Sequence, residues 1–399
     1  MFELQGKYGK AKVYATTVEE ACTSQIYGFM NSPVVENCKV AIMPDCHAGK
    51  GSCIGFTQEV KNRVNPNMVG VDIGCGMLVL KVSKDFKKMD LVKLDKVIRQ
   101  KIPSGMKHRD KIHPFAKEVD LTKLIANVNA SQLALSVGSL GGGNHFIEVD
   151  TDENGDYYIV VHSGSRHLGI EVAGFWEKRA VAYHRDNSKI KSDLIAKLKA
   201  EGREKDIQDE IDKIPAVIVS KELSYLEGED LEGYLHDMKI AQEYARLNRE
   251  AMMDIIVTEM GIKRKDILDK FCTIHNYIDI ENRILRKGAI SLQKDEVAII
   301  PMNMRDGSLI VKGKGNPDWN FSGPHGAGRL MSRSKAKESL KMEDFKKSME
   351  GIYTTSVCVG TIDESPMAYK PADEIIENIK DTAEILNVIK PIYTFKAVE

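Results

Sequence analysis

The sequence carries Ser322-Gly323-Pro324-His325-Gly326-Ala327-Gly328-Arg329, which places one imidazole among small residues with a guanidinium four positions further on. Glycine has no Cβ, so a phosphate group can approach this backbone closely and meet several N–H donors. The Arg329 side chain can grip a phosphate with its fork of donors. A histidine held against a nucleotide phosphate is a candidate nucleophile that would form a phosphoramidate. The alternative is a glycine-rich turn with a solvated histidine, and the other histidines help to decide between the two.

The composition indicates a soluble globular protein. The chain has 399 residues, of which 42% are hydrophobic and 29% charged, which is ample for a large core. No apolar run approaches the roughly 20 residues that span a bilayer. The first residues lack the basic and then apolar layout of a signal peptide. We therefore expect a cytoplasmic protein without membrane contact.

Net charge and cysteine content narrow the function classes further. The formal net charge is −1, so contact with nucleic acid must come from local basic patches such as residues 107–111 and 333–341. The alternative for either patch is a solvated surface. The seven cysteines are odd in number, and none forms a CxxC pair, which argues against a disulfide framework and a zinc knuckle.

Short apolar runs predict strands that border loops containing His, Cys or Asp. They are residues 39–43, 77–82, 157–161, 297–300 and 308–311. Functional groups on loops at strand ends are a common way to build an active site.

Helices are predicted in four regions. Residues 17–20 read as a capping box that opens a helix to about residue 28. Helical periodicity covers residues 237–260 and stops at Gly261. An amphipathic helix is expected over 372–389, followed by an extended tail over 392–397. Residues 186–213 are dense in charge and predict an exposed helical hairpin that turns near Gly202.

The order of these elements is mixed and lacks a regular βαβ rhythm. No Rossmann or Walker glycine pattern is present. We expect an α+β fold with residues 1–399 in a single catalytic domain and the 186–213 hairpin inserted within it.

Val71-Asp72-Ile73-Gly74-Cys75-Gly76 places a carboxylate and a thiol three residues apart in a glycine-rich turn. A thiolate can bridge two metal ions, and a carboxylate can fill a neighbouring position. The alternative is a buried cysteine beside a turn aspartate.

Three more histidines follow the same pattern. His145 comes after three glycines and Asn144, with Glu148 three residues on; His162 ends a predicted strand before Ser163, Ser165 and Arg166; His275 precedes Asn276. Each one alone could be a structural histidine. Together with Asp72 and Cys75 they form a mixed N, O and S set that suits a binuclear site for manganese, zinc or iron(II). Two ions can hold the attacking and leaving oxygens of a phosphoryl transfer.

Over nearly its whole length, the sequence strongly resembles the RtcB family of RNA-splicing ligases, in a divergent bacterial form. The matching segments are Met43-Pro44-Asp45-Cys46-His47, Asp72-Ile73-Gly74-Cys75-Gly76, Gly143-Asn144-His145-Phe146-Ile147-Glu148, His162-Ser163-Gly164-Ser165-Arg166, His275-Asn276, Pro324-His325-Gly326-Ala327-Gly328-Arg329, Ala368-Tyr369-Lys370 and Lys396.

The resemblance implies an RtcB-like fold with mixed sheets around a binuclear metal site. It also implies an RNA ligase that binds two Mn²⁺ ions and uses GTP to guanylylate His325. The GMP then passes to an RNA 3′-phosphate, which is joined to a 5′-hydroxyl, and 2′,3′-cyclic phosphates are opened as well. Such an enzyme serves tRNA splicing or RNA repair, with an activating protein such as archease as a possible partner.

Residue by residue, the resemblance assigns metal ligands, nucleotide contacts and one RNA contact. The metal ligands are Asp72, Cys75, His145, His162 and His275. The nucleotide contacts are Asn144, His145, Phe146, Ile147, Glu148, His275, Asn276, Pro301, Met302, Asn303, Met304, Ser308, His325, Gly326, Ala327, Gly328 and Lys396. Arg166 would orient an RNA phosphate.

Two segments depart from the family pattern. Met302 and Asn303 replace a smaller Gly-Ser pair, and His167 replaces a small residue after Arg166. The alternative function is a binuclear metal-dependent phosphoesterase acting on RNA ends, which would need the metal ligands but neither His325 nor Lys396.

Overall fold

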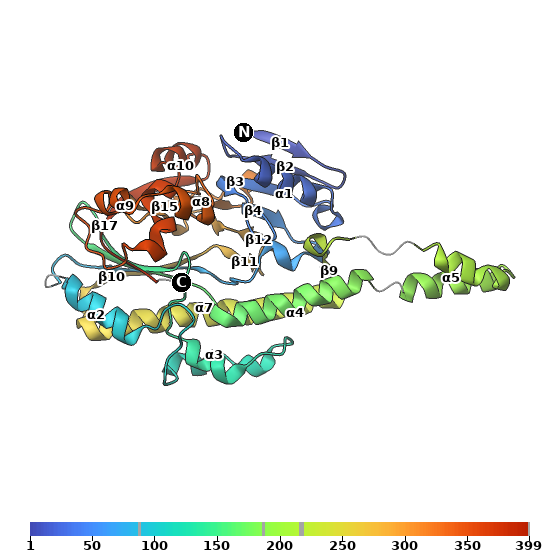
Figure 1. The fold of residues 1–399 in the computed structure, drawn as a ribbon, viewed down its shortest axis with the longest axis horizontal. Helices are drawn as coiled ribbons and strands as arrows, with labels where there is room; N and C mark the ends of the chain where they lie inside the picture. Colours follow the sequence, from blue (N-terminus) through green and yellow to red (C-terminus); the bar gives the residue numbers. More distant parts are fainter. Residues whose placement is uncertain (87–88, 186–187, 215–218, 398–399) are drawn as a thin grey trace.

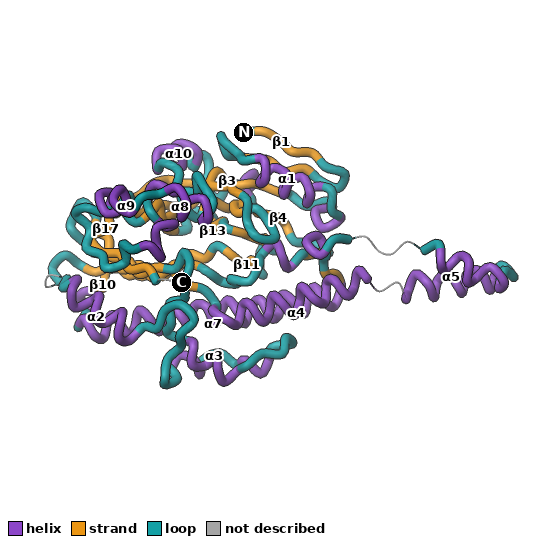
Figure 2. Tube along the Cα trace, in the orientation of Figure 1, coloured by secondary structure: helices purple, strands orange, loops and turns teal. Residues whose placement is uncertain are grey.

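The computed structural model describes residues 1–86, 89–185, 188–214 and 219–397 and combines helices with two large sheets (Figures 1 and 2). The predicted α+β class is confirmed. Among the described residues, no helix has the length and apolar character needed to cross a membrane.

The first sheet has six strands in the order β1-β2-β3-β4-β12-β11. Their bounds are β1 Phe2–Gln5, β2 Lys10–Val13, β3 Val40–His47, β4 Ile54–Glu59, β12 Ile284–Lys287 and β11 Asn276–Asp279. β2 and β3 run parallel, whereas β3 and β4 are antiparallel. The register of β3 against β4 shifts between Ile42 and His47, around Pro44. Proline lacks an N–H and is accommodated at such irregularities.

The second sheet has seven strands in the order β10-β6-β8-β7-β17-β15-β14. Their bounds are β10 Ile267–Ile274, β6 Gly76–Val82, β8 Tyr157–Ser163, β7 Phe146–Thr151, β17 Ala383–Lys396, β15 Gly307–Gly313 and β14 Val297–Asn303. The sheet curls until its two edge strands meet, where the backbone N–H of Ile299 donates to Thr273 Oγ1 at 3.2 Å. Apolar side chains of β6, β8, β14, β15 and β17 form a core on this concave face.

Two small sheets lie beside the large ones. β13 Ala289–Ser291 pairs with β16 Ser322–Pro324, and β5 Arg63–Val64 pairs with β9 Leu226–Glu227. Because β16 ends at Pro324, this pairing fixes the start of the His325 loop.

The helices are α1 Glu20–Met30, α2 Leu91–Lys101, α3 Ala130–Ser136, α4 Arg166–Arg185, α5 Ser188–Ala200, α6 Ile207–Asp212, α7 Gly228–Met260, α8 Arg333–Ser339, α9 Met342–Ser348 and α10 Ala372–Asn378. α7 runs alongside α4 and packs against β6 and β8 (Figure 1). Met252 and Ile256 of α7 share a core with Leu78 and Val161 of those strands.

Most predicted elements are confirmed. The five predicted strands correspond to β3, β6, β8, β14 and β15, and several extend beyond the predicted ends. The 237–260 helix is α7, which starts earlier, at Gly228, and ends at Gly261 with a φ of 72°. Within the predicted 186–213 hairpin, α5 and α6 lie on either side of Gly202, whose φ is 69°, and residues 186 and 187 lie outside the described part.

The capping-box prediction at residues 17–20 was wrong, although the helix itself is present. α1 begins at Glu20, and Glu19 at its N-cap makes no capping hydrogen bond. The Glu19 carboxylate instead accepts from the backbone N–H of Ala48 at 2.6 Å. A tertiary contact has therefore replaced the local cap.

The prediction of a helix over 372–389 was also wrong beyond its first two turns. α10 ends at Asn378, and residues 383–396 form the single strand β17, which includes most of the predicted tail. β17 pairs with β15 along its first half and with β7 along its second half. Hydrogen bonding to two neighbours outweighs the helical pattern of the isolated segment.

Candidate active site

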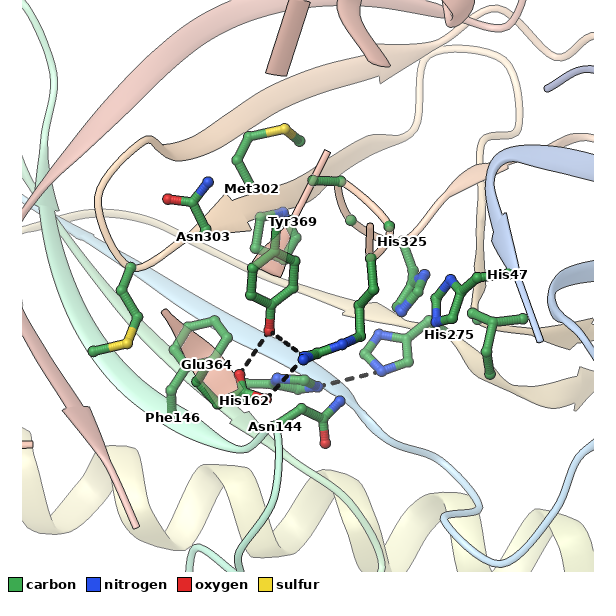
Figure 3. A pocket seen from close by; sticks show the side chains of 18 of the residues that line it. His47, Asn144, Phe146, His162, His275, Met302, Asn303, His325, Glu364 and Tyr369 are labelled. Atoms are coloured by element: carbon green, nitrogen blue, oxygen red, sulfur yellow. Dashed lines mark hydrogen bonds and ion pairs between the residues drawn. The ribbon is translucent and has the colours of Figure 1, made fainter. Parts of the chain in front are cut away.

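One cavity of about 300 Å³ opens between the strand ends of the second sheet and the His325 loop. Figure 3 shows His325, His47 and His275 on the right, Glu364 and Phe146 on the lower left, and His162 between the two groups. The lining residues are His47, Ile54, Asn144, Phe146, Glu148, His162, His275, Asn276, Gly288, Pro301, Met302, Asn303, Met304, His325, Gly326, Ala327, Gly328, Arg329, Arg333, Glu364, Tyr369 and Lys396.

Beside the cavity, a cluster of ligand-type atoms is centred on Cys75. The Cys75 Sγ lies 3.4 Å from His145 Nε2 and 3.2 Å from His162 Nε2. The ligand atoms form two overlapping groups, one of Asp72, Cys75 and His145 and one of Cys75, His162 and His275. Because Cys75 belongs to both groups, the arrangement has the form of two adjacent metal sites that share one sulfur.

Strand register explains why these residues meet. Cys75 directly precedes β6, His145 directly precedes β7, and His275 directly follows β10. His162 near the end of β8 lies opposite Met77 on one side and Phe146 on the other. Neighbouring strands therefore deliver all four side chains to one end of the sheet.

The backbone at Gly164 packs closely against the carboxylate of Asp72. A Cβ added at Gly164 would lie 2.0 Å from Asp72 Oδ1, so any larger residue there would displace the carboxylate. Burial acts to raise the pKa of Asp72, but its interactions with His145, Cys75 and His275 together lower it. Asp72 is therefore available as an anionic ligand.

Burial sets the protonation of the cluster. It lowers the pKa of His162 and of His275, and neighbouring histidines lower both further. These imidazoles are neutral and retain the lone pair that a metal ligand needs. Burial, and then Asp72, raises the pKa of the Cys75 thiol. Such a thiol becomes a thiolate ligand when a cation takes the place of its proton.

His325 lies on the opposite side of the cavity from Glu364, with its ring centroid 5.0 Å from that of His275. Its Nδ1 is 2.6 Å from Asp45 Oδ2, and the same oxygen accepts the His325 backbone N–H at 3.1 Å. A carboxylate oxygen that accepts both bonds holds the proton on Nδ1, which leaves Nε2 with its lone pair. Asp45 is fully buried.

Lys396 and Glu148 lie on neighbouring strands at the other end of the cavity. Lys396 pairs with Phe146, and its Nζ lies 5.3 Å from the centre of that ring. Burial raises the pKa of Glu148 to about 7, although Lys396 acts in the opposite direction. The Lys396 ammonium is bound to Glu364. The carboxyl group of Glu148 also lines the cavity, where its oxygens can accept hydrogen bonds from a ligand.

A family model described as "tRNA-splicing ligase RtcB" matches residues 25–134 and 116–397. The chain belongs to the RtcB family. It is 31% identical to the RNA-splicing ligase RtcB of Escherichia coli K12, with 90% of each chain covered. It is also 25% identical to the tRNA-splicing ligase RtcB of Methanococcus maripaludis, with 94% of this chain and 90% of the relative covered. The resemblance inferred from the motifs is confirmed.

Most of the nucleotide contacts implied by the RtcB family line the cavity, but three do not. Ile147 points to the opposite face of β7 and packs in an apolar core. Ser308 is buried opposite Pro301 on β15, and His145 lies in the Cys75 cluster. For Ile147, strand alternation between Phe146 and Glu148 explains the difference.

Arg166 lies next to the Cys75 cluster and does not line the cavity. Its Nε donates to Ser139 Oγ at 3.1 Å, and its Nη2 donates to the Gly105 carbonyl at 2.5 Å. A Cβ at Gly141 would meet both Arg166 Nη1 and His145 Nδ1, which places the guanidinium beside a cluster histidine.

Sequence reasoning assigned no role to several residues that build the site. Asp45, His47 and Tyr369 stood within RtcB motifs without a role of their own, Arg333 was considered only as part of the basic patch 333–341, and Glu364 stood in no pattern. Lys370, from the Ala-Tyr-Lys motif, donates to the Pro44 carbonyl at 3.3 Å and so braces the bulge that carries Asp45.

The two departures from the RtcB pattern differ in position. Met302 and Asn303 line the cavity, where Asn303 donates to Asp306 at 2.7 Å within a turn. His167 is exposed on α4, 3.6 Å from Glu171, and lies outside the lining of the cavity.

Proposed function

We propose that this protein is a GTP- and Mn²⁺-dependent RNA ligase that joins RNA 3′-phosphate or 2′,3′-cyclic phosphate ends to 5′-hydroxyl ends. Its enzyme class, RNA ligase, is that of the RtcB family. The observation that carries the finer proposal is His325, oriented by Asp45 inside a cavity that adjoins the Cys75 cluster. A phosphoesterase acting on RNA ends has no need of that oriented histidine.

His325 is the proposed nucleophile. With its proton held on Nδ1 by Asp45, Nε2 attacks the α-phosphorus of GTP. A P–N bond forms, the bond to the bridging oxygen breaks, and pyrophosphate leaves. An RNA 3′-phosphate oxygen then attacks the same phosphorus and releases His325. The 5′-hydroxyl oxygen next attacks the activated RNA phosphorus, and GMP leaves.

The donor set fits two divalent ions. Asp72, Cys75 and His145 would hold one ion, and Cys75, His162 and His275 would hold the other. A mixed set of neutral imidazole, carboxylate and thiolate is compatible with Mn²⁺. When bound, the ions would withdraw charge from phosphate oxygens. Arg166, beside His145, would orient an RNA phosphate.

Glu148 and Lys396 fit the edge of guanine. A carboxylate accepts hydrogen bonds, whereas an ammonium only donates them. Guanine offers donors at N1 and at the 2-amino group and an acceptor at O6. Glu148 would take the donors and Lys396 the acceptor, whereas adenine presents the reverse pattern at positions 1 and 6. The adjacent Phe146 ring supplies an apolar face.

The test is covalent labelling. The protein is incubated with GTP labelled at the α-phosphate and Mn²⁺ and run on a denaturing gel beside His325→Ala. We expect label on the unaltered protein alone, stable to base and lost in acid, as for a phosphoramidate. Labelling of His325→Ala would contradict the assigned nucleophile. Absence of label with GTP, ATP and several divalent metals would contradict the ligase mechanism and favour the phosphoesterase.

A further inference from the structure

Glu364 is a buried carboxylate in the cavity wall whose two oxygens have different partners. It ends the 3-10 helix Val359–Glu364 and is 2% exposed. Oε2 accepts from the Lys396 ammonium and from the Tyr369 hydroxyl at 2.7 Å. Oε1 lies 2.7 Å from Arg333 Nη1 and 3.4 Å from Arg329 Nη1.

These contacts join three stretches of chain that are distant in sequence. The arginines follow the His325 loop, Tyr369 follows Glu364 itself, and Lys396 ends β17. In Figure 3, Glu364 lies below the Tyr369 hydroxyl and across the cavity from His325. One carboxylate therefore fixes both the loop that carries the proposed nucleophile and the strand that carries Lys396.

Charge balance shows that Lys396 depends on Glu364. A buried ammonium is costly unless it is paired and hydrogen-bonded. The neighbouring Asp363 is already bound to Arg333 at 2.6 Å and faces Lys337 at 3.8 Å. Although burial opposes ionisation, Lys396 and Arg333 lower the pKa of Glu364 to about 2. Glu364 is therefore anionic at neutral pH.

The backbone of Lys396 is fixed as well. Its N–H donates to Ser356 Oγ at 2.9 Å, and its strand pairs with Phe146. An ammonium has three N–H donors, and Glu364 takes one of them. The remaining donors belong to a side chain that lines the cavity and lies over the Phe146 ring.

We propose that Glu364 is a positioning residue that sets the base specificity of the cavity, because it holds Lys396 where the ammonium meets the 6-oxo group of a purine. The inference rests on the proposed function, since it concerns the nucleotide consumed in the first step. Glu364 acts through Lys396, whereas Glu148 reads the donor side of the base.

The test compares three nucleotides that differ at one edge. GTP has the 6-oxo and 2-amino groups, inosine triphosphate lacks the 2-amino group, and 2-aminopurine riboside triphosphate lacks the 6-oxo group and, with it, the N1 hydrogen. Because the N1 change is the same for every variant, the difference in preference between variants reports on the 6-oxo contact. The kcat/KM for formation of the labelled protein adduct is measured for each with Glu364→Gln. Asp363→Asn is the matched control, because Asp363 contacts Arg333 but not Lys396.

For Glu364→Gln we expect the preference for GTP over the 2-aminopurine nucleotide to fall about tenfold, the scale of one charged hydrogen bond. The preference for GTP over inosine triphosphate should stay within about twofold, and the loss should appear mainly in KM. Asp363→Asn should keep both preferences. Lys396→Gln should reproduce the Glu364→Gln pattern, which keeps the test valid if Glu364→Gln folds poorly.

Three other outcomes would overturn the proposal. If the variants lower kcat/KM for all three nucleotides by the same factor and also lower the melting temperature, Glu364 is a structural brace. If the unaltered protein forms no adduct with any of the nucleotides, the proposed function fails, and this inference fails with it. An adduct on the unaltered protein with unchanged preferences in the variants overturns the inference alone.

Discussion

The two sides of the cavity are assembled in different ways. The Cys75 cluster is built from one aspartate, one cysteine and three histidines, and adjacent strand ends of one sheet deliver the cysteine and the histidines. The Glu364 network is built from charged groups of segments that meet only in the folded chain. Strand register thus places the candidate metal ligands, whereas long-range ion pairs assemble the Glu364 side.

The largest expected effect is at Asp45. In Asp45→Asn the amide could place the proton on the wrong nitrogen of His325, so we expect adduct formation to slow by up to about 10⁴-fold, the scale seen for an orienting carboxylate. The rate of labelling by GTP measures this. Asp318→Asn, a change on the surface beside Lys12, is the control and should label normally. A loss of labelling rate below tenfold would mean that the pairing of β16 with β13 orients His325 without help from Asp45.

The next effect concerns the shared sulfur. Cys75→Ala removes a ligand from both groups at once, whereas His145→Ala removes a ligand from one. We expect Cys75→Ala to weaken Mn²⁺ binding by more than the roughly 10- to 100-fold typical of losing an outer-shell partner. It should affect both ions, and His145→Ala should spare one.

Isothermal titration of metal-stripped protein gives the number of ions and their affinities. Cys272→Ala, which removes an exposed thiol of β10, should bind like the unaltered protein. If Cys75→Ala lost one ion and still bound the other with normal affinity, Cys75 would not be a ligand that both ions share.

The third effect is the pH dependence of Glu148. Its pKa in the folded protein is about 7, above its ordinary value of 4.5, because it is buried. The folded state therefore binds the Glu148 proton more tightly than the unfolded state does. The stabilisation that this proton contributes to the free energy of unfolding is lost as the pH rises from about 4.5 to 7. The size is about 3 kcal/mol at 1.36 kcal/mol per pH unit.

Urea unfolding across this pH range should show a falling free energy of unfolding in the unaltered protein. The fall should be smaller in Glu148→Gln. The affinity for GTP should change in the opposite direction and rise through pH 7, because the ionised carboxylate is the acceptor. Glu153→Gln, at an exposed turn, should keep both profiles. A Glu148→Gln profile that matches the unaltered protein would mean that other groups cause the change.

The smallest effect is at Tyr369. Tyr369→Phe removes the hydrogen bond to Glu364 and the weaker one that the hydroxyl accepts from Arg329 at 3.3 Å, and it leaves the ion pairs of Glu364 intact. We expect a loss of about 1 kcal/mol in the free energy of unfolding, with base preference retained. Denaturant unfolding measures the free energy of unfolding, and the comparison of the three nucleotides measures the base preference. A changed base preference would mean that the hydroxyl, and not the ion pair alone, positions Lys396.

The difference between the Cys75 cluster and the Glu364 network also explains which site residues could be predicted from the sequence. Asp72, Cys75 and the cluster histidines stand in glycine-rich motifs at strand ends, so local patterns located them. Asp45 stood in a quoted motif, but only tertiary contact shows its bond to His325. Glu364 has no local signal, because its charged partners lie 31 to 35 positions away in the sequence on both sides.

At the fold level, strands flanked by turns were predicted well, because alternation and turn residues are local. The 372–389 helix failed because Ala383–Lys396 is stabilised by two neighbouring strands that local periodicity does not report. The mistake fell on the segment that carries Lys396, where the fold depends most on distant contacts.

The placement of β17 has a consequence for biosynthesis. It is made after β7 and β15, yet it lies between them and joins residues as far apart as Asp150 and Pro391. Contacts of such long sequence separation form slowly. The second sheet stays open on the ribosome until this strand emerges, so a stalled or truncated chain would carry the Cys75 cluster motifs without a closed cavity. Such a nascent chain would expose two unpaired strand edges, which makes it a natural substrate for chaperones.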